Sequence, residues 1–155
     1  MIKLKDILFE AKSPKIFIPR RTEDRVERMI KSYIRNGSRG TLDLGNFGLI
    51  ELPSILKDIN VGGFFNCANN KLTSLNNSPK TVVGGSFYCN NNQLISLKGA
   101  PTSVDGNFVC IDNNLTSLVG APKTVGGAFS CRNNSVQFTE EQVRAVCDVK
   151  GTIFV

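Results

Sequence analysis

A segment of 21 or 22 residues occurs four times in succession in this chain, and this repetition restricts the possible folds more than any other feature. The copies begin at Val61, Val83, Val104 and Val125, so their starts lie 22, 21 and 21 residues apart. All four contain the pattern F-x-C-x-x-N, and the first three continue with x-L-x-S-L and then a proline. A unit this short cannot bury its apolar face alone. We therefore expect the copies to stack into a solenoid with one continuous core.

The recurring residues predict how each repeat folds. Phe and Cys two positions apart place both side chains on one face of a short strand. The Asn lies where the chain leaves that strand, and its amide can hydrogen-bond to backbone groups that the turn leaves unpaired. The next recurring position, occupied by Leu72, Leu94, Leu115 and Val136, is expected to point back inward. Stacking then gives three internal columns: Phe65, Phe87, Phe108 and Phe129; Cys67, Cys89, Cys110 and Cys131; and Asn70, Asn92, Asn113 and Asn134.

The repeat resembles the leucine-rich repeat, L-x-x-L-x-L-x-x-N-x-L, in a short form of about 20–22 residues. Phe and Cys occupy two of its leucine positions, and the match covers residues 40–138. The family implies a curved solenoid with parallel strands on the concave side. Proline in the second half of each repeat favours an extended, mostly non-helical convex side. In the degenerate first unit, Phe47 replaces the turn Asn, which leaves the hydrogen bonding of that turn unexplained.

Both ends of the array have sequences typical of caps. Residues 22–39 predict a capping helix that begins at Thr22, ends before Gly37 and has one apolar stripe. The stripe consists of Val26, Met29, Ile30, Tyr33 and Ile34. Residues 139–155 predict a C-terminal cap, in which a capping box opens a short helix and Gly151–Val155 forms a sixth parallel strand. We expect this helix to pack through Val143, Ala145, Val146 and Cys147.

Residue types argue against catalysis and against a metal or cofactor. The chain has no histidine, and its cysteines lack the paired C-x-x-C spacing of zinc sites, so we interpret them as small core residues. Asp43, Asp105 and Asp112 fall at different positions of the repeat, with no basic or nucleophilic partner. We expect no enzyme activity, no metal and no cofactor.

The net charge of +6 resides entirely in residues 1–40, which hold eleven Lys/Arg against five Asp/Glu. Glu23, Asp24 and Glu27 dilute the basic surface of the capping helix, so nucleic-acid binding ranks third among the functions considered. The chain has neither an apolar run long enough for a membrane span nor a secretory signal, which predicts a cytoplasmic protein with free thiols.

The N-terminal extension, residues 1–21, begins with an amphipathic segment that ends in Leu8-Phe9-Glu10-Ala11. This tetrapeptide resembles the prohead-protease cleavage motif of large contractile-tailed bacteriophages. Residues 1–11 thus resemble a capsid-targeting peptide cleaved between Glu10 and Ala11. Together with the repeats, the extension resembles uncharacterised leucine-rich-repeat proteins of those phages. The resemblance implies a location in the bacterial host cytoplasm or in the virion.

Strand residues that alternate with the buried Phe and Cys should form an exposed binding surface. We expect an apolar and aromatic centre with a polar rim, as in protein interfaces. The predicted function is non-catalytic binding of a host or phage protein, and the alternative is a structural or internal head protein of the virion. The predicted partner-binding residues are Phe64, Asn66, Tyr88, Asn90, Asn107, Val109, Ile111, Ser130 and Arg132.

Overall fold

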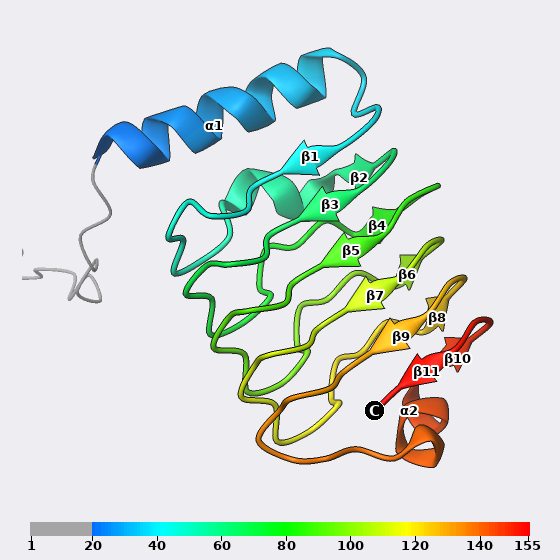
Figure 1. The fold of residues 1–155 in the computed structure, drawn as a ribbon. Coiled ribbons are helices and arrows are strands. Elements are labelled where there is room, and N and C mark those ends of the chain that lie inside the picture. Colours follow the sequence, from blue (N-terminus) through cyan, green and yellow to red (C-terminus); the bar gives the residue numbers. More distant parts are fainter. Residues whose placement is uncertain (1–19) are drawn as a thin grey trace, which may run out of the picture.

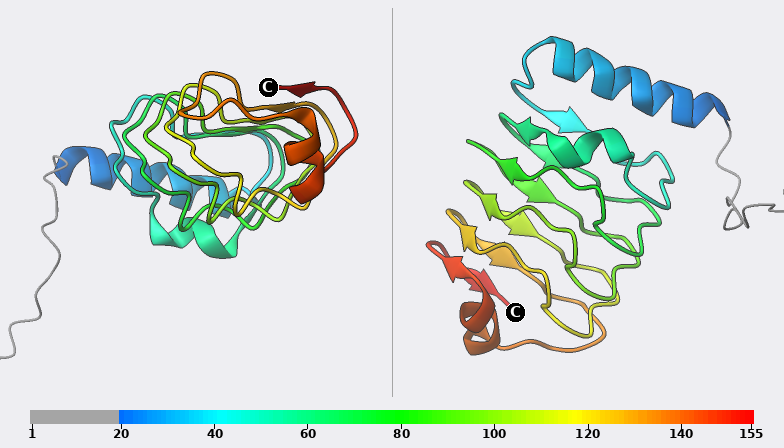
Figure 2. Two further views of the ribbon diagram at one scale, coloured as in Figure 1. Left: turned by 90° about the horizontal axis from the view of Figure 1, so that it is seen from below. Right: turned by 180° about the vertical axis from the view of Figure 1, so that it is seen from behind.

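The computed structural model describes residues 20–155, so the predicted targeting peptide and the cleavage site at Glu10 and Ala11 lie outside the described residues. The described chain coils into a solenoid with one turn per repeat (Figure 1). Viewed along the stack, successive turns nearly superimpose (Figure 2). This arrangement confirms the predicted repeat solenoid.

Two parallel sheets form adjacent sides of the solenoid. The six-stranded sheet consists of β1 (Leu42–Asp43), β3 (Phe65–Asn66), β5 (Phe87–Tyr88), β7 (Phe108–Val109), β9 (Phe129–Ser130) and β11 (Ile153–Phe154), in that order. The predicted sixth strand is therefore present, and it pairs with β9 in parallel. The second sheet consists of β2 (Asn60–Val61), β4 (Thr81–Val82), β6 (Ser103–Val104), β8 (Thr124–Val125) and β10 (Asp148–Val149).

The second sheet was not anticipated from the sequence. Each repeat does return in an extended conformation, as the prolines indicated, but the return segments also pair with one another through the Thr-Val and Ser-Val dipeptides before each turn. Extended segments one repeat apart lie side by side, so their backbone groups bond to each other instead of to water. A 3-10 helix, η2 (Ser54–Asp58), in the first turn was also not predicted.

The register of the six-stranded sheet places identical residues above one another. Phe65, Phe87, Phe108 and Phe129 pair in sequence and are fully buried. Their ring centroids are 5.2, 5.4 and 5.2 Å apart, which is within the range of favourable aromatic pairs. The predicted Phe column is thus a continuous stack at the centre of the core.

The buried asparagines join each turn to the turn before it. The Nδ2 of Asn92 donates to the carbonyl oxygens of Cys89 in its own turn and Cys67 in the preceding turn, while its Oδ1 accepts the N–H of Leu72. The buried Asn113 and the half-buried Asn134 repeat this pattern one and two turns later. Asn70 accepts the N–H groups of Phe47 and Leu49, so the first turn needs no asparagine of its own. The departure at Phe47 is thereby explained.

A column of glycines lies at the corner between the two sheets. A Cβ added to Gly85 would be 2.2 Å from the backbone carbon of Gly63, and one on Gly106 would be 2.7 Å from the backbone oxygen of Gly85. The backbones of consecutive turns lie so close together here that no residue with a Cβ atom fits at these positions. Gly63, Gly85, Gly106 and Gly127 are therefore required by this close approach.

Helix α1 (Arg20–Arg35) covers the N-terminal end of the solenoid (Figure 1). It begins two residues before the predicted start at Thr22, because arginine is a good helix former and the helix continues through the expected cap. Gly37, with φ +78°, follows its end as predicted. Val26, Ile30 and Tyr33 are buried against the first turn.

Helix α2 (Glu140–Val146) and β10 and β11 form the C-terminal cap. The predicted capping box is present, because Thr139 Oγ1 accepts the Gln142 N–H and Gln142 Oε1 accepts the Thr139 N–H. Three residues that were predicted to pack inward in this region are instead exposed. Ala145 and Val146 are exposed, since the short helix turns only Val143 toward the core. Val136 is exposed as well, because its N–H bonds directly to Leu115 O and the buried position passes to Phe138.

Candidate functional site

The outer face of the six-stranded sheet, meaning the side opposite the Phe and Cys columns, contains the predicted partner-binding residues. Side chains alternate along a strand, so a buried Phe65 and Cys67 require Phe64 and Asn66 to point outward. Register extends this alternation to every repeat, because Asn66, Tyr88, Val109 and Ser130 are aligned across neighbouring strands. Of the predicted set, three are exposed, namely Phe64, Asn107 and Arg132, and six are half-buried, namely Asn66, Tyr88, Asn90, Val109, Ile111 and Ser130.

An aromatic pair dominates the N-terminal half of this face. The rings of Phe64 and Tyr88 lie 6.3 Å apart between centroids, with an interplanar angle of 30°. Phe64 is 46% exposed even though it adjoins the fully buried Phe65. Val109 continues the column of Tyr88, and Ile111 lies two residues further along the same strand direction. The predicted apolar centre is thus physically contiguous around Tyr88.

Several polar groups of the face are engaged within the protein. Asp43 Oδ1 accepts hydrogen bonds from Asn66 Nδ2 at 2.8 Å and from the Gly45 N–H at 2.9 Å. Asn66 Oδ1 accepts the N–H of Ala68, and Asn107 Oδ1 accepts the N–H of Ala128. Asn66 and Asn107 therefore hold the sheet together, and only their remaining hydrogen-bonding capacity is available to a ligand.

The C-terminal end of the face holds a residue that the sequence analysis missed. Phe154 pairs with Ser130 in register, so it extends the column of Asp43, Asn66, Tyr88, Val109 and Ser130. It is 37% exposed, and the guanidinium carbon of Arg132 lies 4.9 Å from its ring centroid. The position of Phe154 could have been predicted from the sixth strand, because alignment of Ile153 with Phe129 places Phe154 on the outer face.

An exposed column along the edge of this face was also missed. Asn69, Asn91, Asp112 and Asn133 have positive φ between 52° and 55°, a conformation that Asn and Asp tolerate better than other side chains. Asn91 Nδ2 donates to Asn69 Oδ1, and Asn133 Nδ2 donates to Asp112 Oδ1. The sequence could have predicted this column, because an Asn or Asp directly precedes each asparagine of the column Asn70, Asn92, Asn113 and Asn134.

Three cysteine thiols of the column are hydrogen-bonded within the core and have raised pKa values. The thiols of Cys67, Cys89 and Cys110 each donate to a carbonyl oxygen of the following turn, at 3.3 to 3.4 Å. Burial raises the pKa of these three thiols well above the usual value, and it raises the pKa of Cys131 and of Cys147 to about 11. All five cysteines are free thiols, and burial keeps them protonated at neutral pH. A metal ligand or a nucleophile would instead require the deprotonated thiolate.

Within residues 20–155, no cluster of three or more His, Cys, Asp or Glu side chains is arranged to hold a metal ion. The same residues contain no helix with the length and apolar character needed to cross a membrane.

The fold and the face together define a class: a parallel-strand repeat solenoid with an aromatic patch on its larger sheet. No known protein family matches the chain, and no curated protein or solved structure is significantly similar to it.

Proposed function

We propose that this protein is a non-catalytic interaction module of the leucine-rich-repeat type that binds a protein partner through the outer face. The observation that carries the proposal is the aromatic pair on that face. Phe64 exposes 46% of its surface, and its ring stacks on Tyr88 at 6.3 Å without contributing to the buried Phe stack. Exposed aromatic side chains on a rigid sheet resemble the anchors that supply most of the binding energy in protein interfaces.

The surroundings of this pair support a protein partner. Val109 and Ile111 add apolar surface, and asparagines border it, so the face combines an apolar centre with a polar rim. Of the described residues on the outer face and in the column along its edge, Asp43, Asp112 and Arg132 are charged. A nucleic-acid surface would instead present several cations free to reach phosphates.

Assignment to the leucine-rich-repeat type rests on the order of features within one turn. A short parallel strand with two buried residues is followed by a buried Asn whose amide bonds to the turn backbone, and then by buried leucines. This order matches the strand-and-Asn half of the repeat pattern quoted above. The second sheet on the returning side is compatible with a short repeat that has no room for a helix.

The test compares partner capture by matched variants. Tagged protein is incubated with extract from phage-infected bacteria, the source indicated by the N-terminal motif, and bound proteins are quantified by mass spectrometry. We expect Phe64→Ala and Tyr88→Ala to lower recovery of a specific partner about tenfold or more, as for interface anchors. Ile95→Ala is the control: it truncates a side chain that is 61% exposed but does not lie on the outer face, and it should leave recovery unchanged. Equal capture by all three variants would exclude this face.

The alternative proposal, a virion component, rests on Leu8-Phe9-Glu10-Ala11. Mass spectrometry of purified virions tests it, since a packaged and processed chain would begin at Ala11. Detection of this form would place the interaction within the particle, whereas detection of the protein only in infected-cell extract would favour an intracellular partner.

A further inference from the structure

The column along the edge of the outer face, called the edge column from here on, contains one acid among amides. Its members in four successive turns are Asn69, Asn91, Asp112 and Asn133, and all four are exposed. They share a left-handed backbone conformation. Asn and Asp both tolerate this conformation, so the backbone does not require an acid at position 112.

Hydrogen bonds within the edge column run in one direction. Asn91 Nδ2 donates to Asn69 Oδ1 at 2.9 Å, and Asn133 Nδ2 donates to Asp112 Oδ1 at 3.0 Å. In both pairs the residue of the later turn donates to the residue of the turn before it. The carboxylate of Asp112 has no N–H with which to donate to Asn91 in the same way. The step from Asn91 to Asp112 therefore places two acceptors next to each other.

These two acceptors belong to adjacent turns. The N–H of Asn91 donates to Ile111 O, and β5 pairs with β7, so Asn91 and Asp112 are one strand spacing apart, or about 4.8 Å. Within residues 20–155, neither Asn91 Oδ1 nor Asp112 Oδ2 accepts a hydrogen bond from another residue. Both side chains are exposed, so a donor from another molecule can reach the two oxygens together.

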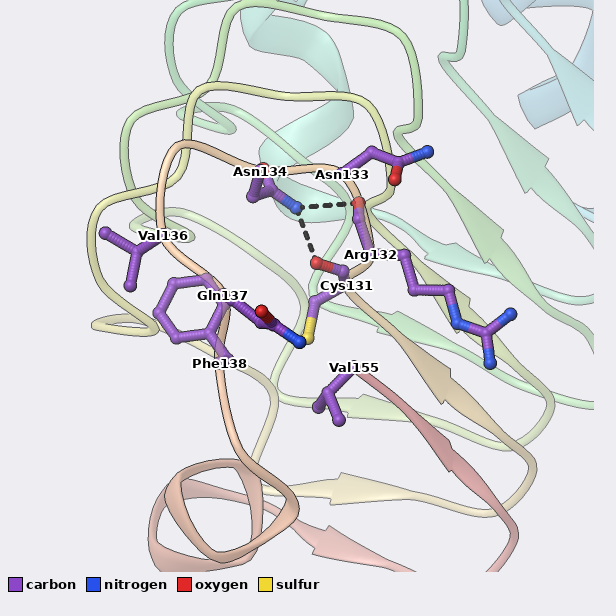
Figure 3. Close-up of a pocket in the computed structure, with 8 residues that line it drawn as sticks. All are labelled: Cys131, Arg132, Asn133, Asn134, Val136, Gln137, Phe138 and Val155. Atoms are coloured by element: carbon purple, nitrogen blue, oxygen red, sulfur yellow. Dashed lines mark hydrogen bonds between the residues drawn. The ribbon is translucent and has the colours of Figure 1, made fainter.

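The nearby Arg132 does not neutralise this carboxylate. Its guanidinium carbon lies 4.9 Å from the ring centroid of Phe154, and no ion pair joins it to Asp112 in the part of the chain that the structure describes. Figure 3 shows that the Arg132 side chain extends away from the amide of Asn133, which is the group that bonds to Asp112. Asp112 therefore presents its negative charge to solvent.

The acceptor pair adjoins the apolar centre of the outer face. Ile111 directly precedes Asp112, and Tyr88 lies three residues before Asn91. Tyr88 and Asp112 are separated by one strand spacing across the sheet and three residues along it, which amounts to roughly 11 Å. An extended peptide covers this distance in about three to four residues. One short segment of a partner can therefore contact both the aromatic pair and the acceptor pair.

We propose that the partner bound by the outer face contributes an arginine, whose guanidinium bridges Asn91 Oδ1 and the carboxylate of Asp112 while a neighbouring apolar side chain contacts Tyr88. The arginine belongs to the partner of the function proposed above, so its role depends on that function. A guanidinium carries its N–H donors in a fixed planar fork and can donate to two acceptors at once, whereas the ammonium of lysine acts as a point charge. A basic and partly apolar peptide segment thus matches this surface in charge and in hydrogen bonding.

A random peptide library tests this chemistry without prior identification of the partner. Peptides of about twelve residues, displayed on yeast, are selected on the immobilised full chain under reducing conditions. We expect the enriched sequences to contain Arg about three to five residues from an aromatic or aliphatic residue. Asp112→Asn gives this position the residue found in the neighbouring turns, so the variant should unfold at an unchanged temperature. Selection on this variant should not enrich arginine.

Affinities of the most enriched peptide, measured by fluorescence anisotropy, locate the contact. Binding to Asp112→Asn should be about tenfold weaker, and replacement of the peptide's Arg by Gln should have a similar effect on the wild-type chain, as expected for loss of a charged hydrogen bond. Replacement of this Arg by Lys should restore only part of the affinity. Asp58→Asn is the control, because it removes the same charge from a side chain that is 69% exposed and lies outside the outer face, and it should leave binding unchanged.

Several outcomes would overturn the inference. These are the absence of arginine enrichment on the wild-type chain, equal peptide affinity of Asp112→Asn and wild type, and equal losses in the two Asn variants, which would indicate a general effect of charge. Calcium binding that Asp112→Asn abolishes would also overturn it, by identifying a metal ion as the occupant. Enriched peptides that lack arginine but lose binding in Tyr88→Ala would overturn the arginine contact and leave the outer-face proposal intact.

Discussion

The side-chain nitrogen of Asn92 lies 3.0 Å from the carbonyl oxygen of Cys67, a residue of the preceding turn. The same side chain accepts the N–H of Leu72 at 3.0 Å through its Oδ1. One buried amide thus satisfies a donor and an acceptor in a neighbouring repeat as well as backbone groups in its own. The stacking of repeats is therefore specified by polar contacts and not by apolar burial alone.

Replacement of this amide should be costly. Asn92→Ala would leave the Leu72 N–H and the Cys67 carbonyl short of partners inside the core, and we expect a loss of about 2–4 kcal/mol in the free energy of unfolding. Urea denaturation followed by circular dichroism measures this loss. The adjacent variant Gln93→Ala changes an exposed side chain and should cost less than about 0.5 kcal/mol. Similar losses in both variants would refute the role assigned to Asn92.

Two adjacent phenylalanines provide a second comparison. Phe65→Ala removes a fully buried ring from one end of the Phe stack, and we expect a loss of about 3–5 kcal/mol. Phe64→Ala removes a ring that is 46% exposed and should cost about 1 kcal/mol or less. Thermal and urea unfolding of both variants measures the difference. A larger loss at Phe64 than at Phe65 would show that the strand faces are assigned the wrong way round.

The glycine column predicts a similar contrast within one turn. Gly84 has φ +74° with open space around its Cα, so Gly84→Ala should cost only about 1 kcal/mol of backbone strain. Gly85→Ala would place a methyl group 2.2 Å from the backbone of Gly63, which forces two turns apart. We expect a loss of about 3 kcal/mol or more, measured by urea unfolding. Equal tolerance of both substitutions would contradict the close approach of the backbones.

The raised thiol pKa values predict a loss of stability in alkali. Burial holds the pKa of Cys131 and Cys147 at about 11, against an ordinary value of 9.0, and raises those of Cys67, Cys89 and Cys110 further. Above pH 9 the unfolded chain loses thiol protons that the folded chain retains. The free energy of unfolding should therefore be constant near neutral pH and fall between about pH 9 and pH 11.

Urea midpoints measured from pH 7 to pH 10.5 check this dependence. Cys89→Ser supplies the control, because serine does not ionise in this range. This variant should be less stable throughout but less sensitive to pH, since one contributing thiol is gone. Identical slopes for the two proteins would show that thiol ionisation is not responsible.

Much of the candidate site followed from the repeat pattern. Once Phe65 and Cys67 are assigned to the core, alternation places Phe64 and Asn66 outside, and the period carries this assignment to Tyr88 and Val109. The exposed Val136 broke the pattern, because the last turn shifts its bonding to Leu115 by one residue before the capping helix. No periodicity in the sequence signals a shift that occurs once.

The sequence by itself determined the repeat length, the buried Phe, Cys and Asn columns and the existence of both caps, because each depends on residue type and spacing. Only the tertiary structure decided that the return segments form a second sheet and that glycine backbones touch at the corner. These features depend on distances between neighbouring turns, and such distances are set by the packing of the whole stack and not by any one repeat.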